Sequence, residues 1–165
     1  MTTPTRFATT EDFYKGGVEI IGDDAAPRYL FSNMFEVASK SPPWERVVIA
    51  RNLEFTVECA RAEGSSPWYL CAHDETVLCM QGAVEIKFLK PENDALPQAD
   101  TAGAVRLEAE PTGQAMGYAR LKRGHMALLP AGAAYRITAT GVGVLLLQSL
   151  LGAESRERWA TICQH

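Results

Sequence analysis

The sequence predicts an all-β fold, either a sandwich or a barrel, from three observations. From residue 45 onward, short segments alternate between apolar and polar residues, as strands with one buried face do. Glycine and proline separate these segments at expected turns. A convincing helical pattern occurs only near the C-terminal end. Eight or more short strands with almost no helix are typical of a sandwich or barrel.

Composition is that of one globular domain covering residues 1–165. The hydrophobic fraction of 47% and the charged fraction of 22% argue against disorder. The net charge is −4, and no basic stretch is long enough to neutralise a phosphate backbone. We therefore expect no nucleic-acid partner.

The sequence also predicts a cytoplasmic location without membrane contact. Met1–Gly17 lacks the apolar core of a signal peptide. The longest apolar run, Val142–Leu151, is too short to span a bilayer. None of the four cysteines forms a CxxC pair, so we expect buried thiols rather than disulfides.

The N-terminal third contains fewer expected elements. Residues 1–21 form a polar arm ending in a short strand at Val18–Ile21. Arg28–Val37 is rich in aromatic and β-branched residues and predicts a strand. The Ser41-Pro42-Pro43 segment then interrupts the chain.

Residues 45–150 carry the barrel. Leu53, Phe55, Val57 and Cys59 alternate with polar residues, so we expect this apolar set to face the core. A turn is expected at Gly64–Pro67, and a tight hairpin at Gln81-Gly82. The further expected strands are Trp68–Ala72, Glu75–Met80, Ala83–Leu89, Tyr118–Lys122, His125–Leu129, Ala133–Thr138 and Val142–Leu150.

Two remaining segments differ from the barrel strands. Residues 90–114 are predicted to form a long loop with one short strand near Val105–Glu108, and the loop is either a lid or a surface excursion. Gly152–Cys163 is the expected C-terminal helix. Its Trp159, Ile162 and Cys163 fall at i, i+3 and i+4, a stripe suited to packing on the barrel.

Two local patterns identify a family resemblance. Glu75 is followed by six mostly apolar residues and Gly82, as in the second half of the first cupin motif. Gly124 is followed by five residues and then Pro130-Ala-Gly132, as in the second cupin motif. Together, and with a variable segment between them, these patterns resemble the cupin superfamily over residues 45–150.

The resemblance implies a cupin-type double-stranded β-helix, a jelly-roll barrel with the short helix 152–163 at its C-terminal end. It implies an interior that can hold a metal and a small molecule. It also implies a homodimer, since cupins commonly pair through sheet edges and N-terminal strands. The arm at 1–21 is then expected to cross to a partner and cover an exposed edge.

The chain departs from the cupin pattern at the metal ligands. The usual His-x-His before the glutamate is replaced by Tyr69 and Cys71 at one spacing, or by Trp68 and Leu70 at the other. The histidine that usually ends the second motif is replaced by Tyr135. Glu75 is therefore the one usual ligand retained at its position.

Two histidines near the motifs offer a substitute ligand set. His73 lies two residues before Glu75, so an extended strand would direct both side chains to one face. His125 lies five residues before Pro130. We predict His73, Glu75 and His125 as ligands of non-haem iron or another divalent transition metal. The alternatives are that His73 and Glu75 bond to each other or to a neighbouring strand, and that His125 lies at the surface.

Other residues also have two interpretations. Tyr135 either bonds to a substrate and moves a proton, or packs in the core. Cys71 is either a soft metal ligand or a packing residue. The charged residues Arg46, Arg51, Glu54 and Glu58 either clamp a carboxylate at the barrel mouth or form solvated strand faces. The aromatic residues Trp44, Trp68 and Tyr69 either wall a pocket or form core or dimer contacts.

The resemblance implies a metal-dependent oxygenase, specifically a dioxygenase acting on a small hydroxylated aromatic compound. His73 and Glu75 would hold the metal, and Tyr135 would position substrate or move a proton. The alternative is a cupin without a metal. It would be an isomerase or lyase with Tyr135, His73 and Glu75 as acid and base, or a small-molecule binding protein.

Overall fold

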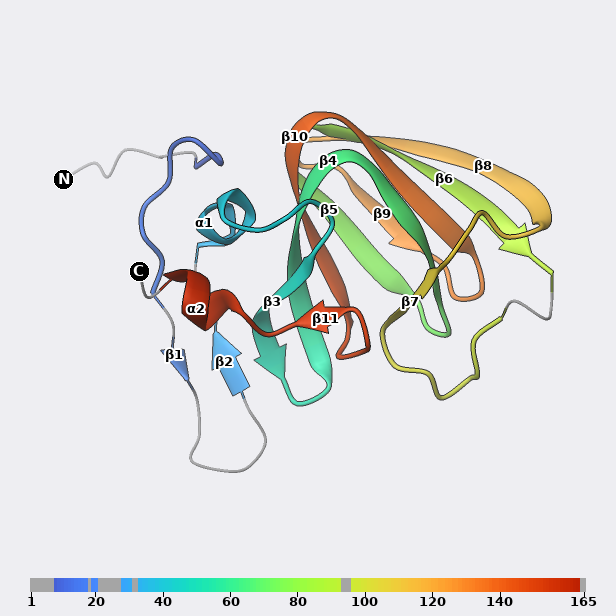
Figure 1. Ribbon diagram of the computed structural model, residues 1–165, viewed down its shortest axis with the longest axis horizontal. Coiled ribbons are helices and arrows are strands. Elements are labelled where there is room, and N and C mark those ends of the chain that lie inside the picture. Colours follow the sequence, from blue (N-terminus) through green and yellow to red (C-terminus); the bar gives the residue numbers. More distant parts are fainter. Residues whose placement is uncertain (1–7, 18, 21–27, 31–32, 93–95, 164–165) are drawn as a thin grey trace.

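The computed structural model describes residues 8–17, 19–20, 28–30, 33–92 and 96–163 (Figure 1). The elements in chain order are β1 Glu19–Ile20, β2 Arg28–Leu30, α1 Met34–Ser39, β3 Arg46–Asn52, β4 Phe55–Cys71, β5 Glu75–Gln81, β6 Ala83–Pro91, β7 Ala104–Leu107, β8 Gly113–Lys122, β9 Met126–Leu129, β10 Ala134–Leu150, β11 Ser155–Arg156 and α2 Trp159–Cys163. The predicted all-β jelly roll with a short C-terminal helix is confirmed. No helix in these described ranges is long and apolar enough to cross a membrane.

Two long antiparallel strands, β4 and β10, organise the barrel. The first part of β10 pairs with β6 and its second part with β5. Likewise, β4 pairs with β3 through its first part and with β7 through its last part. Each long strand thus belongs to both layers of the barrel, and Figure 1 shows both curving over its top.

The continuity of β4 and β10 corrects the expected strand boundaries. The prediction placed a turn at Gly64–Pro67 and separate strands at Ala133–Thr138 and Val142–Leu150. Instead the β4–β10 ladder continues through register shifts at Arg136/Thr138 and Ala139/Gly143. Irregularities of this kind bend a strand without ending its pairing.

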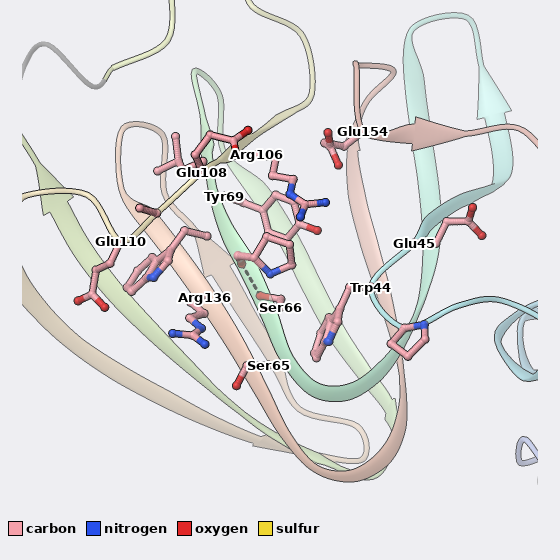
Figure 2. Close-up of a pocket in the computed structure, with 15 residues that line it drawn as sticks. Trp44, Glu45, Ser65, Ser66, Tyr69, Arg106, Glu108, Glu110, Arg136 and Glu154 are labelled. Atoms are coloured by element: carbon pink, nitrogen blue, oxygen red, sulfur yellow. Dashed lines mark hydrogen bonds between the residues drawn. The ribbon is translucent and has the colours of Figure 1, made fainter.

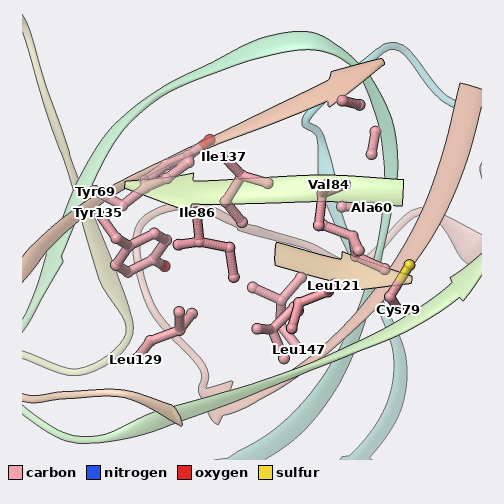
Figure 3. Close-up of a cluster of buried hydrophobic side chains, with 14 of the residues drawn as sticks. Ala60, Tyr69, Cys79, Val84, Ile86, Leu121, Leu129, Tyr135, Ile137 and Leu147 are labelled. Atoms are coloured by element: carbon pink, nitrogen blue, oxygen red, sulfur yellow. The ribbon is translucent and has the colours of Figure 1, made fainter. Parts of the chain in front are cut away.

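The main core lies between the two layers (Figure 3). Its buried side chains come from strands of both motifs, among them Val77, Ile86, Leu129 and Leu147. A second cluster lies outside the layer that contains β3, where β2, α1 and α2 pack over that strand. This cluster includes Trp159, Ile162 and Cys163, so the predicted packing stripe is confirmed.

Several predicted elements differ at their ends. The expected strand Arg28–Val37 ends at Leu30, and α1 follows, because the Asn33 side chain accepts a hydrogen bond from Phe35 N and caps the helix. The expected helix Gly152–Cys163 is shortened to α2. Its first part forms β11, which pairs in parallel with β3.

The segment 90–114 is more ordered than the predicted loop. Strand β6 extends to Pro91, β8 begins at Gly113, and Glu92 N donates to Thr112 O at 3.1 Å. The short strand expected near Val105–Glu108 is confirmed as β7. Residues 93–95 lie outside the described residues.

The N-terminal arm is described only in part. Thr10 N and the Gln81 side-chain oxygen are 2.8 Å apart, and Gly16 N donates to Glu36. The described part of the arm thus packs on its own chain. Residues 1–7, 18 and 21 of the predicted arm lie outside the described residues.

Both cupin motifs fall at the expected strand–turn–strand positions. Glu75 opens β5, and Gly82 separates β5 from β6 with φ of +79°. A Cβ at Gly82 would lie 3.0 Å from Gly143 Cα, so close backbone approach and positive φ both require glycine there. Gly132, with φ of +73°, lies between β9 and β10. The motifs thereby bring Glu75 and Tyr135 to the barrel interior.

Candidate functional site

A cluster of charged and polar side chains lies inside the barrel, which we call the interior cluster. It consists of Arg46 from β3, Glu58 from β4, Glu75 from β5 and Tyr135 from β10. Arg46 is 4% exposed, and the other three are 1% exposed. Charged groups are rarely buried to this extent unless they are paired.

Arg46 is the centre of the cluster. Its Nε donates to Glu58 Oε2 at 2.5 Å, its Nη2 donates to Glu75 Oε1 at 2.5 Å, and its Nη1 donates to the Tyr135 hydroxyl at 3.1 Å. The Tyr135 hydroxyl in turn donates to Glu75 Oε2 at 2.5 Å. Ser155 Oγ donates to the other oxygen of Glu58 at 2.5 Å. The two carboxylates are therefore fully engaged by the protein itself.

The surroundings of each group in the cluster determine whether it is protonated. Burial alone would raise the pKa of Glu75, but the Arg46 guanidinium outweighs it and lowers that pKa to about 2. Burial and the neighbouring Glu75 charge raise the pKa of Tyr135 well above its usual value. Arg46 also stays protonated, because the charges of Glu58 and Glu75 outweigh its desolvation. Within the cluster, Glu75 is thus a carboxylate, Arg46 a guanidinium cation and Tyr135 a neutral phenol.

These residues do not fit a metal ion. Glu75, the retained cupin ligand, already binds a guanidinium with one oxygen and a phenol with the other. A second cation at this carboxylate would face the charge of Arg46 directly. Moreover, no group of three or more His, Cys, Asp or Glu side chains among the described residues is arranged to hold a metal.

The structure does not bring the predicted ligands His73, Glu75 and His125 together. His73 precedes β5 in a bend, so strand alternation does not extend to it. Its Nε2 accepts from Gly103 N at 3.0 Å, and its Nδ1 lies 3.0 Å from Asp74 O. His125 is exposed in the turn before β9, where its Nδ1 accepts from Lys122 N. Of the three, Glu75 alone reaches the barrel interior.

Cys71 is buried beside this cluster as a neutral thiol. Burial raises its pKa, and the Glu75 charge raises it further. All four cysteines are free and buried, as predicted. Cys71 packs within the main core, which favours its interpretation as a packing residue.

Sequence reasoning did not identify Arg46 and Glu58 as interior residues, because charged side chains on strands more often face solvent. The predicted core face of β4 is confirmed only in part: Cys59 and Val57 pack in the second cluster, but Phe55 is 55% exposed. The alternate residues Thr56 and Glu58 are buried as well. A signal was present in the sequence, because one arginine and two glutamates on different strands of one barrel can satisfy one another in its interior.

Two cavities adjoin the interior cluster. An inner cavity of about 10 Å³ lies beside Arg46 and Tyr135, near the lower limit for one water molecule. An outer pocket of about 640 Å³ lies between the bend of β4, β7 and the segment before β3 (Figure 2). Trp44 and Tyr69 line both cavities, so these rings separate the interior cluster from the outer pocket.

Trp44 holds this position with a strained backbone. Its φ is +66°, a value that side chains other than glycine rarely adopt. Its backbone N donates to Arg61 O at 2.9 Å, and its indole Nε1 donates to Glu63 O at 2.8 Å. These two bonds to β4 fix the ring between the inner cavity and the outer pocket.

Comparison with solved structures places the chain among known proteins. A chain of hydroquinone 1,2-dioxygenase from Sphingomonas sp. TTNP3, solved with 4-hydroxybenzoate bound, is 48% identical, with 99% of this chain and 98% of that chain covered and a TM-score of 0.84. A chain of the hydroquinone 1,2-dioxygenase PnpCD, in complex with Cd²⁺ and 4-hydroxybenzonitrile, is 45% identical, with coverage of 98% and 97% and a TM-score of 0.81.

A second kind of chain from PnpCD also matches. In its complex with Fe³⁺, the matched chain is 13% identical over 74% of this chain, with 32% of that chain covered and a TM-score of 0.55. This likeness shows a shared fold within a much longer chain. No family model matches the sequence, and no curated protein sequence matches it. The near-complete matches and both motifs together show that the chain belongs to the cupin superfamily, in the same family as the two short dioxygenase chains.

Proposed function

We propose that this chain is one subunit of a metal-dependent dioxygenase that acts on a small hydroxylated aromatic compound of the hydroquinone type. The observation that carries this proposal is the identity of 48% and 45%, over nearly the whole of both chains, to chains of hydroquinone 1,2-dioxygenases. Those enzymes were solved with phenolic ligands, which are the class of compound expected from the sequence.

The metal of this enzyme belongs, in our proposal, to a second and longer chain. PnpCD contains a long cupin-fold chain in addition to the short chain that this protein matches. The barrel of the present chain is filled by Arg46, whose guanidinium occupies the carboxylate that a cupin metal would use. If the longer chain binds the metal and the present chain does not, this division of work explains both the presence of two cupin chains and the occupied Glu75 carboxylate.

The present chain would then contribute through assembly and through its surface. Its interior cluster ties β3, β4, β5 and β10 together, and its inner cavity is too small for an aromatic ring. The predicted catalytic roles of Tyr135, His73 and Glu75 stay predictions. An isomerase or lyase that used Tyr135 and Glu75 would need the barrel mouth at Trp44 to open.

The proposed function also implies a binding partner for this chain. We expect the functional unit to contain the longer chain, whereas the sequence alone predicted a homodimer. The two assemblies differ in mass and composition, so native mass spectrometry of the purified protein separates them. The cytoplasmic location likewise stays a prediction.

Co-expression tests the proposed function directly. We would purify this chain alone, and together with the longer cupin-fold chain from the same source, and supply Fe²⁺ to both. Hydroquinone-dependent oxygen uptake is expected only from the co-purified pair. Equal uptake by the short chain alone would refute the division of work, and no uptake by a stable pair with hydroquinone or other phenols would refute the dioxygenase.

A further inference from the structure

The outer pocket contains two buried N–H groups that lack an acceptor. Trp68 Nε1 and Arg136 Nε are the buried side-chain nitrogen or oxygen atoms without a hydrogen-bond partner among the described residues. Both residues line the outer pocket. Trp68 as a whole is 4% exposed. A buried donor left without an acceptor costs about 1–3 kcal/mol, so two in one pocket are unusual.

The two donors are held side by side by the sheet. Arg136 on β10 and Trp68 on β4 are directly opposite each other in the antiparallel ladder. Residues in such a pair have Cβ atoms about 4.5–5.5 Å apart. The register shift that bends β10 follows immediately, between Arg136 and Thr138. One acceptor group with two oxygens can therefore meet both donors.

The charge of Arg136 is also without a counterion. Within the described ranges no ion pair includes Arg136, whereas most other charged residues near it are paired. Lys87, opposite Arg136 on β6, binds Glu110 at 3.0 Å and lies 5.4 Å from the Trp68 ring centroid. Glu45, at the other side of the pocket, binds Arg158 at 2.7 Å. Among the described residues, the Arg136 guanidinium thus has no carboxylate partner, although Glu108 and Glu154 of the same pocket lining are also in no ion pair.

The carboxylates that line the pocket do not supply the missing acceptor. In Figure 2, Glu154 lies at the opposite end of the pocket from Arg136, and Glu108 lies beside Arg106. Ser66 is the nearest hydroxyl on β4, but its Oγ already donates to Pro67 O and accepts from Ile137 N. None of these described side chains therefore satisfies the two donors, and a ligand group that reaches them would supply the missing acceptor.

We infer that Arg136 and Trp68 form a binding site for the carboxylate of a small aromatic acid. A carboxylate offers two acceptor oxygens and the negative charge that a guanidinium prefers. The rest of the pocket suits an aromatic ring, since Trp44, Tyr69 and Leu107 line it as well. A volume of about 640 Å³ is within the range of small-molecule sites.

This site is separate from the interior cluster and does not depend on the proposed dioxygenase. It needs neither a metal nor the longer chain, so it can be tested on the isolated full-length protein. If the site does not bind a carboxylate, the proposed dioxygenase function is unaffected. If the proposed function is wrong, the site can still bind a carboxylate. The same carboxylate chemistry has a second source, the side chain of a partner protein, which the test below distinguishes.

Titration with benzoate, followed by NMR of the indole N–H signals, tests the inference. The chain has three tryptophans, Trp44, Trp68 and Trp159, so three indole signals are expected, and Trp68→Phe assigns the one of interest. Benzoate should shift the Trp68 signal saturably and leave Trp159 unchanged. Benzamide has the same shape without the charge, and it should bind at least about tenfold more weakly.

Three variants complete the design. Arg136→Gln should weaken benzoate binding at least about tenfold, because a charge-assisted pair is lost. The matched control Arg120→Gln, an exposed arginine on β8 of the same layer, should bind as wild type. Unchanged positions of the Trp44 and Trp159 signals in Arg136→Gln verify that this variant is folded. If Arg136→Gln is misfolded, Arg136→Lys, which keeps the charge but lacks the guanidinium, tests the same contact.

Three results would overturn the inference. The first is the absence of a saturable shift at Trp68. The second is equal binding of benzamide, or equal binding by Arg136→Gln. The third is a Trp68 shift that occurs on assembly with the longer chain but not with benzoate, which would assign the acceptor to a partner protein.

Discussion

Glu75 uses both of its carboxylate oxygens within the protein. Arg46 Nη2 donates to one oxygen and the Tyr135 hydroxyl donates to the other, each at 2.5 Å. In a metal-binding cupin, the corresponding glutamate would be a ligand. Here a guanidinium supplies the positive charge instead, and it also satisfies Glu58 on the opposite side. The interior cluster is therefore complete without a metal.

Removal of the central cation should destabilise the fold strongly. Arg46→Met leaves two buried carboxylates without a counter-charge, and the loss of one partner of a buried pair costs about 3–5 kcal/mol. The free energy of unfolding in urea measures the effect. The matched control Arg61→Met removes an arginine of the surface pair with Glu63 and should cost at most about 1 kcal/mol. Similar losses in the two variants would contradict the role of Arg46 as the counter-charge of the buried carboxylates.

The low pKa of Glu75 predicts a loss of stability in acid. Its pKa is about 2 in the folded protein and near 4.5 in the unfolded chain, so the unfolded state binds the proton first. Its contribution of about 3 kcal/mol is complete above about pH 5 and is lost as pH falls from 4.5 toward 2.

Unfolding free energy measured across this pH range, in wild type and Glu75→Gln, tests the assignment. The variant is less stable at neutral pH, and its stability should fall less steeply in acid because this titration is absent. An identical acid slope in both proteins would mean that Glu75 is not the group responsible.

Loss of the phenol should have a smaller effect than loss of the guanidinium. Tyr135→Phe removes the donor to Glu75 and the acceptor of Arg46 Nη1, so we expect a loss of about 1–3 kcal/mol. Tyr118→Phe is the control, because Tyr118 is 62% exposed, and its cost should stay within about 0.5 kcal/mol. Equal stability of the two variants would place the Tyr135 hydroxyl outside the network.

We expect His73 to fix the segment before β7 through a hydrogen bond rather than to bind a metal. Its Nε2 accepts from Gly103 N, immediately before β7, and Gly103 packs closely on Gly152. His73→Ala should therefore speed hydrogen exchange at the Gly103 amide while exchange in β5 stays slow. The metal content of the assembled dioxygenase should not change. A loss of metal in this variant would restore His73 as a ligand.

The motifs predicted the fold because turns and glycines constrain the backbone locally. Gly82 and Gly132 occupy turns with positive φ, and each such position is visible in the sequence itself. The boundaries of the long strands were not predictable in the same way. The irregularity of β10 between Ala139 and Gly143 leaves a sequence pattern that resembles a turn between two strands.

The face assignment of β4 was only partly right, for a related reason. Alternation identifies two faces but not which one points into the barrel, and near Cys59 both faces of β4 are covered. Cys59 packs in the cluster outside the barrel, while Glu58 is buried within it. The hydrophobic pattern therefore located the outer cluster, and the charge pairing of Arg46 with Glu58 and Glu75 was missed.

Metal analysis of the purified short chain tests the central claim most directly. We would measure metal by inductively coupled plasma mass spectrometry in the short chain alone and in its complex with the longer chain, each after reconstitution with Fe²⁺. The account predicts no stoichiometric metal in the short chain, and metal in the complex that persists in the Glu75→Gln variant. Stoichiometric metal in the isolated short chain that is lost in Glu75→Gln would contradict it.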